Sequence, residues 1–461
     1  MPSRVKRVNN KILLQSRAYS LKTHCRSMNI RLTVYLVGLL TLGTALLTAA
    51  QIADDGFVNG DLLPNAPELA ARGSHQVGVR TIKLVHQAQV DILHTNEGKH
   101  PLYNRPLTLE VWYPARSSAS QSARVTYASV LGRSNDPKRP LIPFTFAGRA
   151  IRDAEPDTRQ NAYPLVIVSH GYPGSRLLLT YLTENLASKG YVVAAIDHTE
   201  STYSDLAGFP STLLNRAFDD LFVLDEMARL SQKGSTSFLA GLLNAQNTAL
   251  IGYSMGGYGA LNVAGAGYSQ QAVTLFGQLT GGSTALEVRS MDSPRYKASI
   301  DPRIKAVVAF APWGMERGVW DTAGLAGLAL PTLFVAGSKD DVSGYEKGIK
   351  AIYEGATNAD RYLLTYVNAR HNVAPNPPPL ASMQPNVPAD DYMHYAEPVW
   401  NERRINNINQ HFVTAFLGIH LQKLDYGKFL DLPQTESVGP WTGFKARMAV
   451  GLEMRHAKPA N

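Results

Sequence analysis

Cysteine is almost absent from this chain. The single thiol, Cys25, lies in an N-terminal segment that we expect to be cleaved off, so the mature chain would contain no cysteine. This absence excludes a disulfide framework, a thiolate nucleophile and a cysteine-ligated metal site. A chain of 461 residues does not need disulfides, because a domain of this size buries enough apolar surface to be stable without them.

Acidic residues are absent from the first 50 positions, which hold eight Lys and Arg. The other 37 basic residues balance the 37 acidic ones, so the formal charge of +8 belongs to this leader. The rest of the chain is formally neutral and gives no indication of a nucleic-acid partner.

The leader contains one uncharged apolar run at 32–50, LTVYLVGLLTLGTALLTAA, which ends in small residues. A run of this kind behind a basic segment is typical of a signal peptide, and Thr48 and Ala50 suit the positions before a cleavage site. We therefore expect an exported protein, periplasmic or extracellular in a bacterium, whose mature chain begins near Gln51. The alternative is an uncleaved membrane anchor, because the run is just long enough to span a bilayer.

Short β-branched strands alternate with helices through the body of the chain. Strands are expected at 77–85, 107–113, 165–169, 191–196, 249–253, 306–310, 332–336 and 362–367, and helices at 176–188, 215–230 and 408–421. This alternation predicts an α/β fold with a mostly parallel central sheet and helices on both faces.

The expected organisation has four parts. They are the leader at 1–50, a flexible segment at 51–75, one catalytic domain at 76–423 and a C-terminal tail at 424–461 to which we assign no role. Gly-, Pro- and charge-rich stretches interrupt the domain as long loop insertions at 116–161, 267–302 and 372–398. Insertions of this length often form lids or substrate-binding loops, although they can also be surface loops without a role.

The strongest chemical signal is a G-x-S-x-G motif, Gly252-Tyr253-Ser254-Met255-Gly256. An apolar strand precedes it and a helix-compatible run of small residues follows. The two glycines allow the strand to turn sharply into the helix, which leaves the serine hydroxyl exposed at the edge of the sheet. We predict Ser254 as a nucleophile on this context rather than on the short motif alone.

A nucleophilic serine needs a general base, and the base needs an acid that orients it. In this strand–turn–helix context the chain order is Ser, then Asp or Glu, then His. Asp340 and Asp341 follow the strand at 332–336, and His371 follows the strand at 362–367. We predict His371 as the base and Asp340 as the acid, because Asp340 lies three residues after the glycine that ends its strand; Asp341 is the alternative.

Other histidines fit the role of base less well. His394 follows no expected strand, whereas His411 and His420 lie on the helix expected at 408–421 and are interpreted as structural. His170 opens the loop after the strand at 165–169, and we expect it to shape that loop.

The tetrahedral oxyanion of ester hydrolysis needs two preorganised N–H donors. One candidate is the backbone N–H of Met255, because the first amides of a helix have no acceptor within the helix. The other is the backbone N–H of Tyr172, in the loop His170-Gly171-Tyr172-Pro173-Gly174.

Several segments together resemble a known family. PLVIVSHGYPGS, ENLASKGYVVAAIDHTEST and GYSMGGYGA are similar to secreted platelet-activating-factor acetylhydrolases and to the bacterial group called predicted dienelactone hydrolases. The resemblance runs from about residue 73 to 421 and implies the α/β-hydrolase fold. True dienelactone hydrolases use cysteine where this chain has serine. The mammalian-type acetylhydrolases place their acid after the strand that here ends in FAPW at 310–313, without a carboxylate.

The same segments also resemble bacterial cutinases and polyester hydrolases. That resemblance implies that Tyr172 and Trp313 clamp an acyl or aromatic group beside the serine; alternatively, Trp313 is a core tryptophan. The chain lacks the disulfide common in those enzymes, and its insertions could cover a flat polymer-binding surface.

These observations predict hydrolysis of carboxylic esters through an acyl-enzyme, with short-chain acyl esters or acetyl phospholipid-like molecules as substrates and without metal or cofactor. A cutinase-like polyester hydrolase is the first alternative, and amide hydrolysis by the same residues is not excluded. A non-enzymatic binding protein of this fold is the alternative from another class, although such relatives usually lose one of the three catalytic residues.

Overall fold

The computed structural model describes residues 56–116 and 124–460. The expected leader, with Cys25 and the cleavage site before Gln51, lies outside the described residues. Within these two ranges, no helix is both long enough and apolar enough to cross a membrane.

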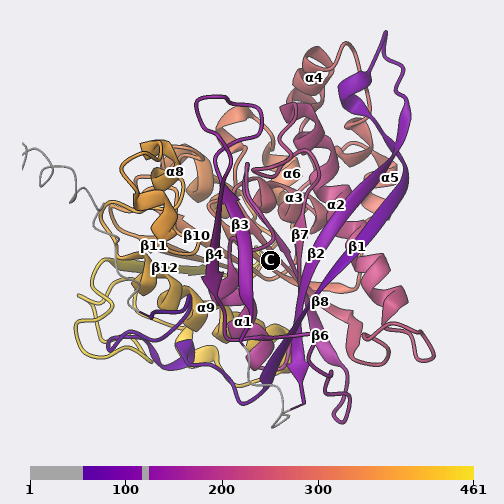
Figure 1. Cartoon of the computed structure of the whole chain (residues 1–461). Helices are drawn as coiled ribbons and strands as arrows, with labels where there is room; N and C mark the ends of the chain where they lie inside the picture. Colours follow the sequence, from indigo (N-terminus) through magenta and orange to yellow (C-terminus); the bar gives the residue numbers. More distant parts are fainter. Residues whose placement is uncertain (1–55, 117–123, 461) are drawn as a thin grey trace, which may run out of the picture. The chain divides into compact units, whose positions relative to one another are not determined.

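A ten-stranded sheet forms the centre of the fold, in the order β12-β11-β10-β9-β8-β6-β7-β2-β1-β5 (Figure 1). Its strands are β1 (Gln76–Val90), β2 (Leu102–Ala115), β5 (Ile151–Arg152), β6 (Tyr163–Ser169), β7 (Val192–Asp197), β8 (Leu243–Tyr253), β9 (Ile304–Phe310), β10 (Thr332–Gly337), β11 (Arg361–Tyr366) and β12 (Leu452–Ala457). The strands from β6 to β11 pair in parallel. Antiparallel pairs lie on both sides of them, β2 with β7 and β1 with β2 on one side and β11 with β12 on the other. The predicted α/β-hydrolase fold with a mostly parallel sheet is confirmed.

Helices cover both faces of this sheet. α1 (Thr180–Ser188) and α9 (Glu402–Gln422) pack together on one face, and α2 (Phe209–Leu230) and α3 (Met255–Val263) pack together on the other (Figure 1). The central strands are therefore buried on both sides, which explains why they are continuous apolar runs instead of alternating ones. In β9, for example, all five residues from Ala306 to Phe310 are buried.

The three insertions contain more regular structure than the loops that the sequence predicts. The first holds a two-stranded sheet of β3 (Thr126–Leu131) and β4 (Ile142–Ala147). The second holds α4 (Gln270–Leu279) and α5 (Pro294–Ala298), and the third holds α8 (Ala389–Met393). Their stability comes from distant partners, which no local pattern reveals: Tyr127 of β3 accepts a hydrogen bond from Trp112 Nε1 at 2.6 Å and donates one to Glu184 of α1 at 2.7 Å.

The C-terminal tail belongs to the central sheet. Its strand β12 pairs antiparallel with β11, from Leu452 opposite Tyr366 to Ala457 opposite Arg361. An edge strand has one neighbour and buries only alternate residues, so its apolar signal in the sequence is weak. α6 (Thr322–Ala326) and α7 (Lys350–Gly355) complete the α-helices of the described residues.

The segment expected to be flexible also packs on the domain from residue 56 onward. The N–H of Leu63 donates to Asn407 Oδ1 at 2.9 Å, Gln410 Nε2 donates to the Gly60 carbonyl at 3.1 Å, and Ala70 is fully buried. Both partner side chains belong to α9. The hydrogen bonds link residues more than 340 positions apart. The composition of the segment carries no information on such contacts and therefore predicts a flexible segment.

Candidate active site

Ser254 lies at the sharp turn between β8 and α3. Its backbone has φ +53° and ψ −112°, a conformation that is uncommon outside glycine. The turn needs the two glycines of the motif. A Cβ on Gly252 would lie 2.3 Å from the Gly256 carbonyl oxygen, and a Cβ on Gly256 would lie 2.0 Å from the Ser169 carbonyl oxygen. The strained turn thus depends on close backbone packing.

Ser254, His371 and Asp340 form one hydrogen-bonded chain. His371 Nε2 lies 3.0 Å from Ser254 Oγ, and His371 Nδ1 lies 2.8 Å from Asp340 Oδ2. A carboxylate accepts, so Nδ1–H donates to Asp340 and leaves Nε2 free to accept the serine proton. The three residues follow β8, β11 and β10, whose carboxyl ends meet at one edge of the sheet. All three side chains are buried.

The geometry separates the two neighbouring aspartates. Asp340 Oδ1 accepts hydrogen bonds from the N–H groups of Val342 at 2.9 Å and Ser343 at 2.8 Å, which holds the carboxylate toward His371. Asp341 points away, is 45% exposed and pairs with Arg370. The structure therefore brings Asp340, and not Asp341, to the histidine.

The other histidines make structural contacts. His394 Nε2 donates to the Pro173 carbonyl at 3.0 Å, and burial lowers the pKa of His394 to about 4. His411 Nδ1 accepts from the N–H of Leu69 at 3.0 Å inside a cluster of aromatic rings, and His420 packs against Phe416. Within residues 56–116 and 124–460, no group of three or more His, Cys, Asp or Glu could hold a metal ion.

The loop that follows β6 lies directly against the nucleophile. A Cβ on Gly171 would be 3.1 Å from the Tyr253 ring and 3.5 Å from Ser254 Cβ. The N–H of Tyr172 has no hydrogen-bond acceptor in the part of the chain that the structure describes. Met255 is the first residue of α3, where the N–H has no acceptor within the helix. Two backbone N–H groups beside Ser254 are therefore free to bind an oxygen.

Tyr172, Phe209 and Trp313 form a cluster of aromatic rings. The backbone N–H of Trp313 donates to the Ser254 carbonyl at 3.2 Å, which places the backbone of Trp313 next to that of Ser254. Phe209, the first residue of α2, lies between the other two rings, with centroid distances of 5.1 Å to Tyr172 and 5.5 Å to Trp313. Tyr172, Phe209 and Trp313 are all partly exposed. The sequence contains no signal for Phe209, because it precedes the helix expected at 215–230 and belongs to no motif.

The chain is similar to known esterases in sequence and in fold. The family "Platelet-activating factor acetylhydrolase, isoform II" matches residues 146–207, which include the loop before Tyr172. Cutinase est1 of Thermobifida alba is 25% identical over 217 residues, which are 47% of this chain and 55% of that protein. Cutinase 2 of Thermobifida cellulosilytica is 24% identical over 219 residues, 47% of this chain and 63% of that protein.

Among solved structures, a ferulic acid esterase from Streptomyces cinnamoneus superposes with a TM-score of 0.53 at 21% identity, covering 85% of this chain and 100% of that one. The chain spans about half the length of the cutinases that it matches. These likenesses establish an α/β-hydrolase fold with similarity to cutinases and to the isoform II acetylhydrolases.

Proposed function

We propose that this chain, an α/β-hydrolase, is a carboxylic ester hydrolase that uses Ser254 as its nucleophile. One observation carries the proposal: His371 Nε2 lies 3.0 Å from Ser254 Oγ while its Nδ1 lies 2.8 Å from Asp340. A serine next to a base that is itself oriented by a buried acid is the arrangement that nucleophilic catalysis requires. The similarity to several esterases supports the same reaction class.

The reaction takes two acyl-transfer steps. Ser254 Oγ attacks the ester carbonyl carbon while its proton moves to His371 Nε2, and Asp340 stabilises the resulting imidazolium. The N–H groups of Tyr172 and Met255 stabilise the oxyanion, and the leaving alkoxide takes the proton from His371. Water then attacks the acyl-enzyme by the same route, which releases the acid and returns the proton to Ser254.

Substitution Ser254→Ala tests the nucleophile. We expect kcat for p-nitrophenyl butyrate to fall by at least about 10⁴-fold, with an unchanged circular dichroism spectrum. A fluorophosphonate probe should label the wild-type protein at Ser254 and leave the variant unlabelled. Retained turnover in Ser254→Ala would overturn the proposal. Failure of the intact wild-type protein to react with the probe would support the non-enzymatic binding protein instead.

The ring cluster of Tyr172, Phe209 and Trp313 favours a second candidate, hydrolysis of bulky aromatic or polymeric esters. Partly exposed rings beside a nucleophile can stack on an aromatic acyl group. Substitution Trp313→Ala should then lower kcat/KM for a p-nitrophenyl benzoate-type ester about 10-fold and change the value for p-nitrophenyl acetate little. Equal effects on both esters would favour the acetyl phospholipid or short-chain candidates. A polyester film and an acetyl phospholipid, assayed side by side, separate the remaining classes.

Export completes the proposal. The basic leader and the apolar run at 32–50 support cleavage before Gln51. The N-terminal mass of protein recovered from the culture medium or periplasm measures this directly. A mature chain that begins well upstream of Gln51 would favour the membrane anchor.

A further inference from the structure

A buried arginine lies directly behind the loop that contains Tyr172. Arg216 belongs to α2 and is 1% exposed. Its Nη1 donates to the His170 carbonyl, and its Nη2 donates to the Gly171 carbonyl at 2.9 Å and to Ser201 Oγ at 2.5 Å. These acceptors are all neutral. Burying a guanidinium is costly, and Arg216 Nε has no hydrogen-bond partner among the described residues, so a side chain needed only for packing would be apolar at this position.

The Gly171 carbonyl is held by two donors. Besides Arg216, His170 Nδ1 lies 2.6 Å from this oxygen. Since a carbonyl only accepts, Nδ1 carries the proton, and Nε2 accepts from the N–H of His198 at 3.2 Å. Burial, together with the charge of Arg216, lowers the pKa of His170 well below its ordinary value. His170 therefore stays neutral in the tautomer that donates to Gly171.

A carbonyl held in place also fixes the direction of the N–H bond of the next residue. The peptide bond between Gly171 and Tyr172 is planar and trans, so the Tyr172 N–H points opposite to the Gly171 carbonyl. The loop lies between Arg216, which contacts this carbonyl, and Ser254, whose Cβ is 3.5 Å from the place of a Gly171 Cβ. Drawing the carbonyl toward α2 thus directs the N–H away from α2.

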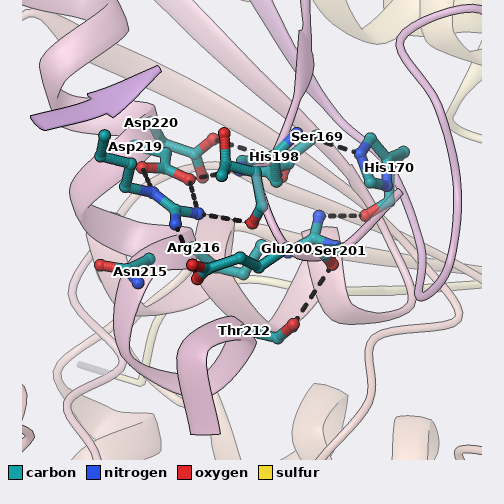
Figure 2. Close-up of polar contacts among 12 residues, drawn as sticks. Ser169, His170, His198, Glu200, Ser201, Thr212, Asn215, Arg216, Asp219 and Asp220 are labelled. Atoms are coloured by element: carbon teal, nitrogen blue, oxygen red, sulfur yellow. Dashed lines mark hydrogen bonds and ion pairs between the residues drawn. The ribbon is translucent and has the colours of Figure 1, made fainter. Parts of the chain in front are cut away.

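A buried polar network lies next to Arg216 and the loop (Figure 2). Ser169, the last residue of β6, donates to His198 Nε2 at 2.7 Å, and His198 Nδ1 donates to Asp219 Oδ2 at 2.9 Å. Asp219 in turn accepts two hydrogen bonds from Arg105, at 2.8 and 2.9 Å. These four side chains are almost fully buried. The network joins β6, the residue after β7, β2 and α2, so the helix that carries Arg216 is tied to three parts of the sheet.

We infer that Arg216 is a positioning residue for the oxyanion hole: by holding the His170 and Gly171 carbonyls, it sets the direction of the Tyr172 N–H. The inference rests on the proposed function, because an oxyanion forms only if Ser254 attacks an ester. Arg216 touches neither substrate nor reacting atoms. Its effect is on the orientation of one donor, so it should act on transition-state stabilisation and hardly on substrate binding.

Substitutions Arg216→Met and Arg216→Lys test this role with p-nitrophenyl butyrate. We expect Arg216→Met to lower kcat about 10- to 100-fold and to change KM less than about threefold, because misorienting a donor costs less than removing it. Arg216→Lys keeps one donor group and should recover part of the loss. An alkyl trifluoromethyl ketone forms an oxyanion on Ser254, so its Ki should rise in each variant by the same factor by which kcat/KM falls.

Arg289→Met is the matched control. Arg289 is also buried and donates to Asn262 at 2.7 Å and to Ser299 at 3.0 Å, away from the loop at 170–174. We expect it to lower the melting temperature as Arg216→Met does but to leave kcat and the ketone Ki within about twofold. Equal kinetic losses in both variants would overturn the inference, since they would indicate general destabilisation.

If Arg216→Met has the kcat of the wild-type protein and Ser254→Ala is inactive, the inference about Arg216 is overturned and the proposed function stands. Activity in Ser254→Ala would overturn the proposed function itself. If Arg216→Met does not fold, Arg216→Lys tests the inference in its place. A kcat reduced at least threefold, with a parallel rise in the ketone Ki, would support the positioning role. An unchanged kcat would overturn it.

Discussion

Asp340 and Asp341 are neighbours with opposite surroundings. Asp340 accepts from His371 and two backbone N–H groups, whereas Asp341 pairs with Arg370 at the surface. Asp340→Asn should lower kcat by about 10³- to 10⁴-fold, because the amide no longer selects the Nδ1–H tautomer of His371. Asp341→Asn serves as the control and should keep kcat within about twofold. Steady-state kinetics with one ester compare the two, and the reverse order would contradict the assignment of the acid.

At the same scale, the residues found from sequence are those that belong to a motif or follow a strand. Ser254, His371 and Asp340 were predicted on order and spacing. Arg216 and Phe209 carry no such signal, because an arginine or a phenylalanine in a helical segment is ordinary. Their importance arises from what the fold places beside them, the Gly171 carbonyl and the Trp313 ring.

At the scale of elements, two insertions are tied together by a buried ion pair. Arg139, in the loop between β3 and β4, donates through Nε to Asp391 of α8 at 2.8 Å. Arg139→Met should lower the free energy of unfolding by about 3 kcal/mol, because it leaves a buried carboxylate unpaired. The double variant Arg139→Met/Asp391→Leu should recover most of that loss. Urea denaturation of the single and double variants measures the coupling.

An exposed ion pair provides the control for these variants of the buried pair. Arg229 is 60% exposed and pairs with Glu226 one turn away on α2. Arg229→Met should leave the free energy of unfolding nearly unchanged, because solvent screens an exposed pair. A cost for Arg139→Met as small as that for Arg229→Met would show that the ion pair does not hold the insertions together.

At the scale of the whole molecule, one buried lysine makes stability depend on pH. Lys189 Nζ donates to the Leu69 carbonyl at 2.6 Å, to Asn185 Oδ1 at 2.7 Å and to Thr414 Oγ1 at 2.7 Å, so it joins the N-terminal segment, α1 and α9. Burial, reinforced by the charge of Arg72, lowers the pKa of Lys189 to about 7.

Between pH 7 and 9 the folded protein loses the Lys189 proton, and with it one of these three donated hydrogen bonds, while the unfolded chain still binds the proton. Stability therefore rises with pH in this window, by up to about 1.4 kcal/mol per pH unit from this group. Lys189→Met removes this pH-dependent gain in stability. The substitution should therefore destabilise the protein more at pH 9 than at pH 6.5, as measured by urea denaturation. Lys350→Met, at a partly exposed lysine paired with the exposed Glu346, should show no such change. An equal cost of Lys189→Met at both pH values would contradict the titration.

The sequence by itself determined the α/β architecture, since buried parallel strands must be continuous apolar runs and their alternation with helices follows from the crossover connections. It also predicted Ser254 as the nucleophile, because G-x-S-x-G between an apolar strand and a helix is typical of the turn that exposes a catalytic serine. Tertiary structure alone decided the strand β12, the packing of residues 56–75, and the place of Arg216. Each of these depends on contacts between residues far apart in the chain, and a local pattern reports only on neighbours within a few turns.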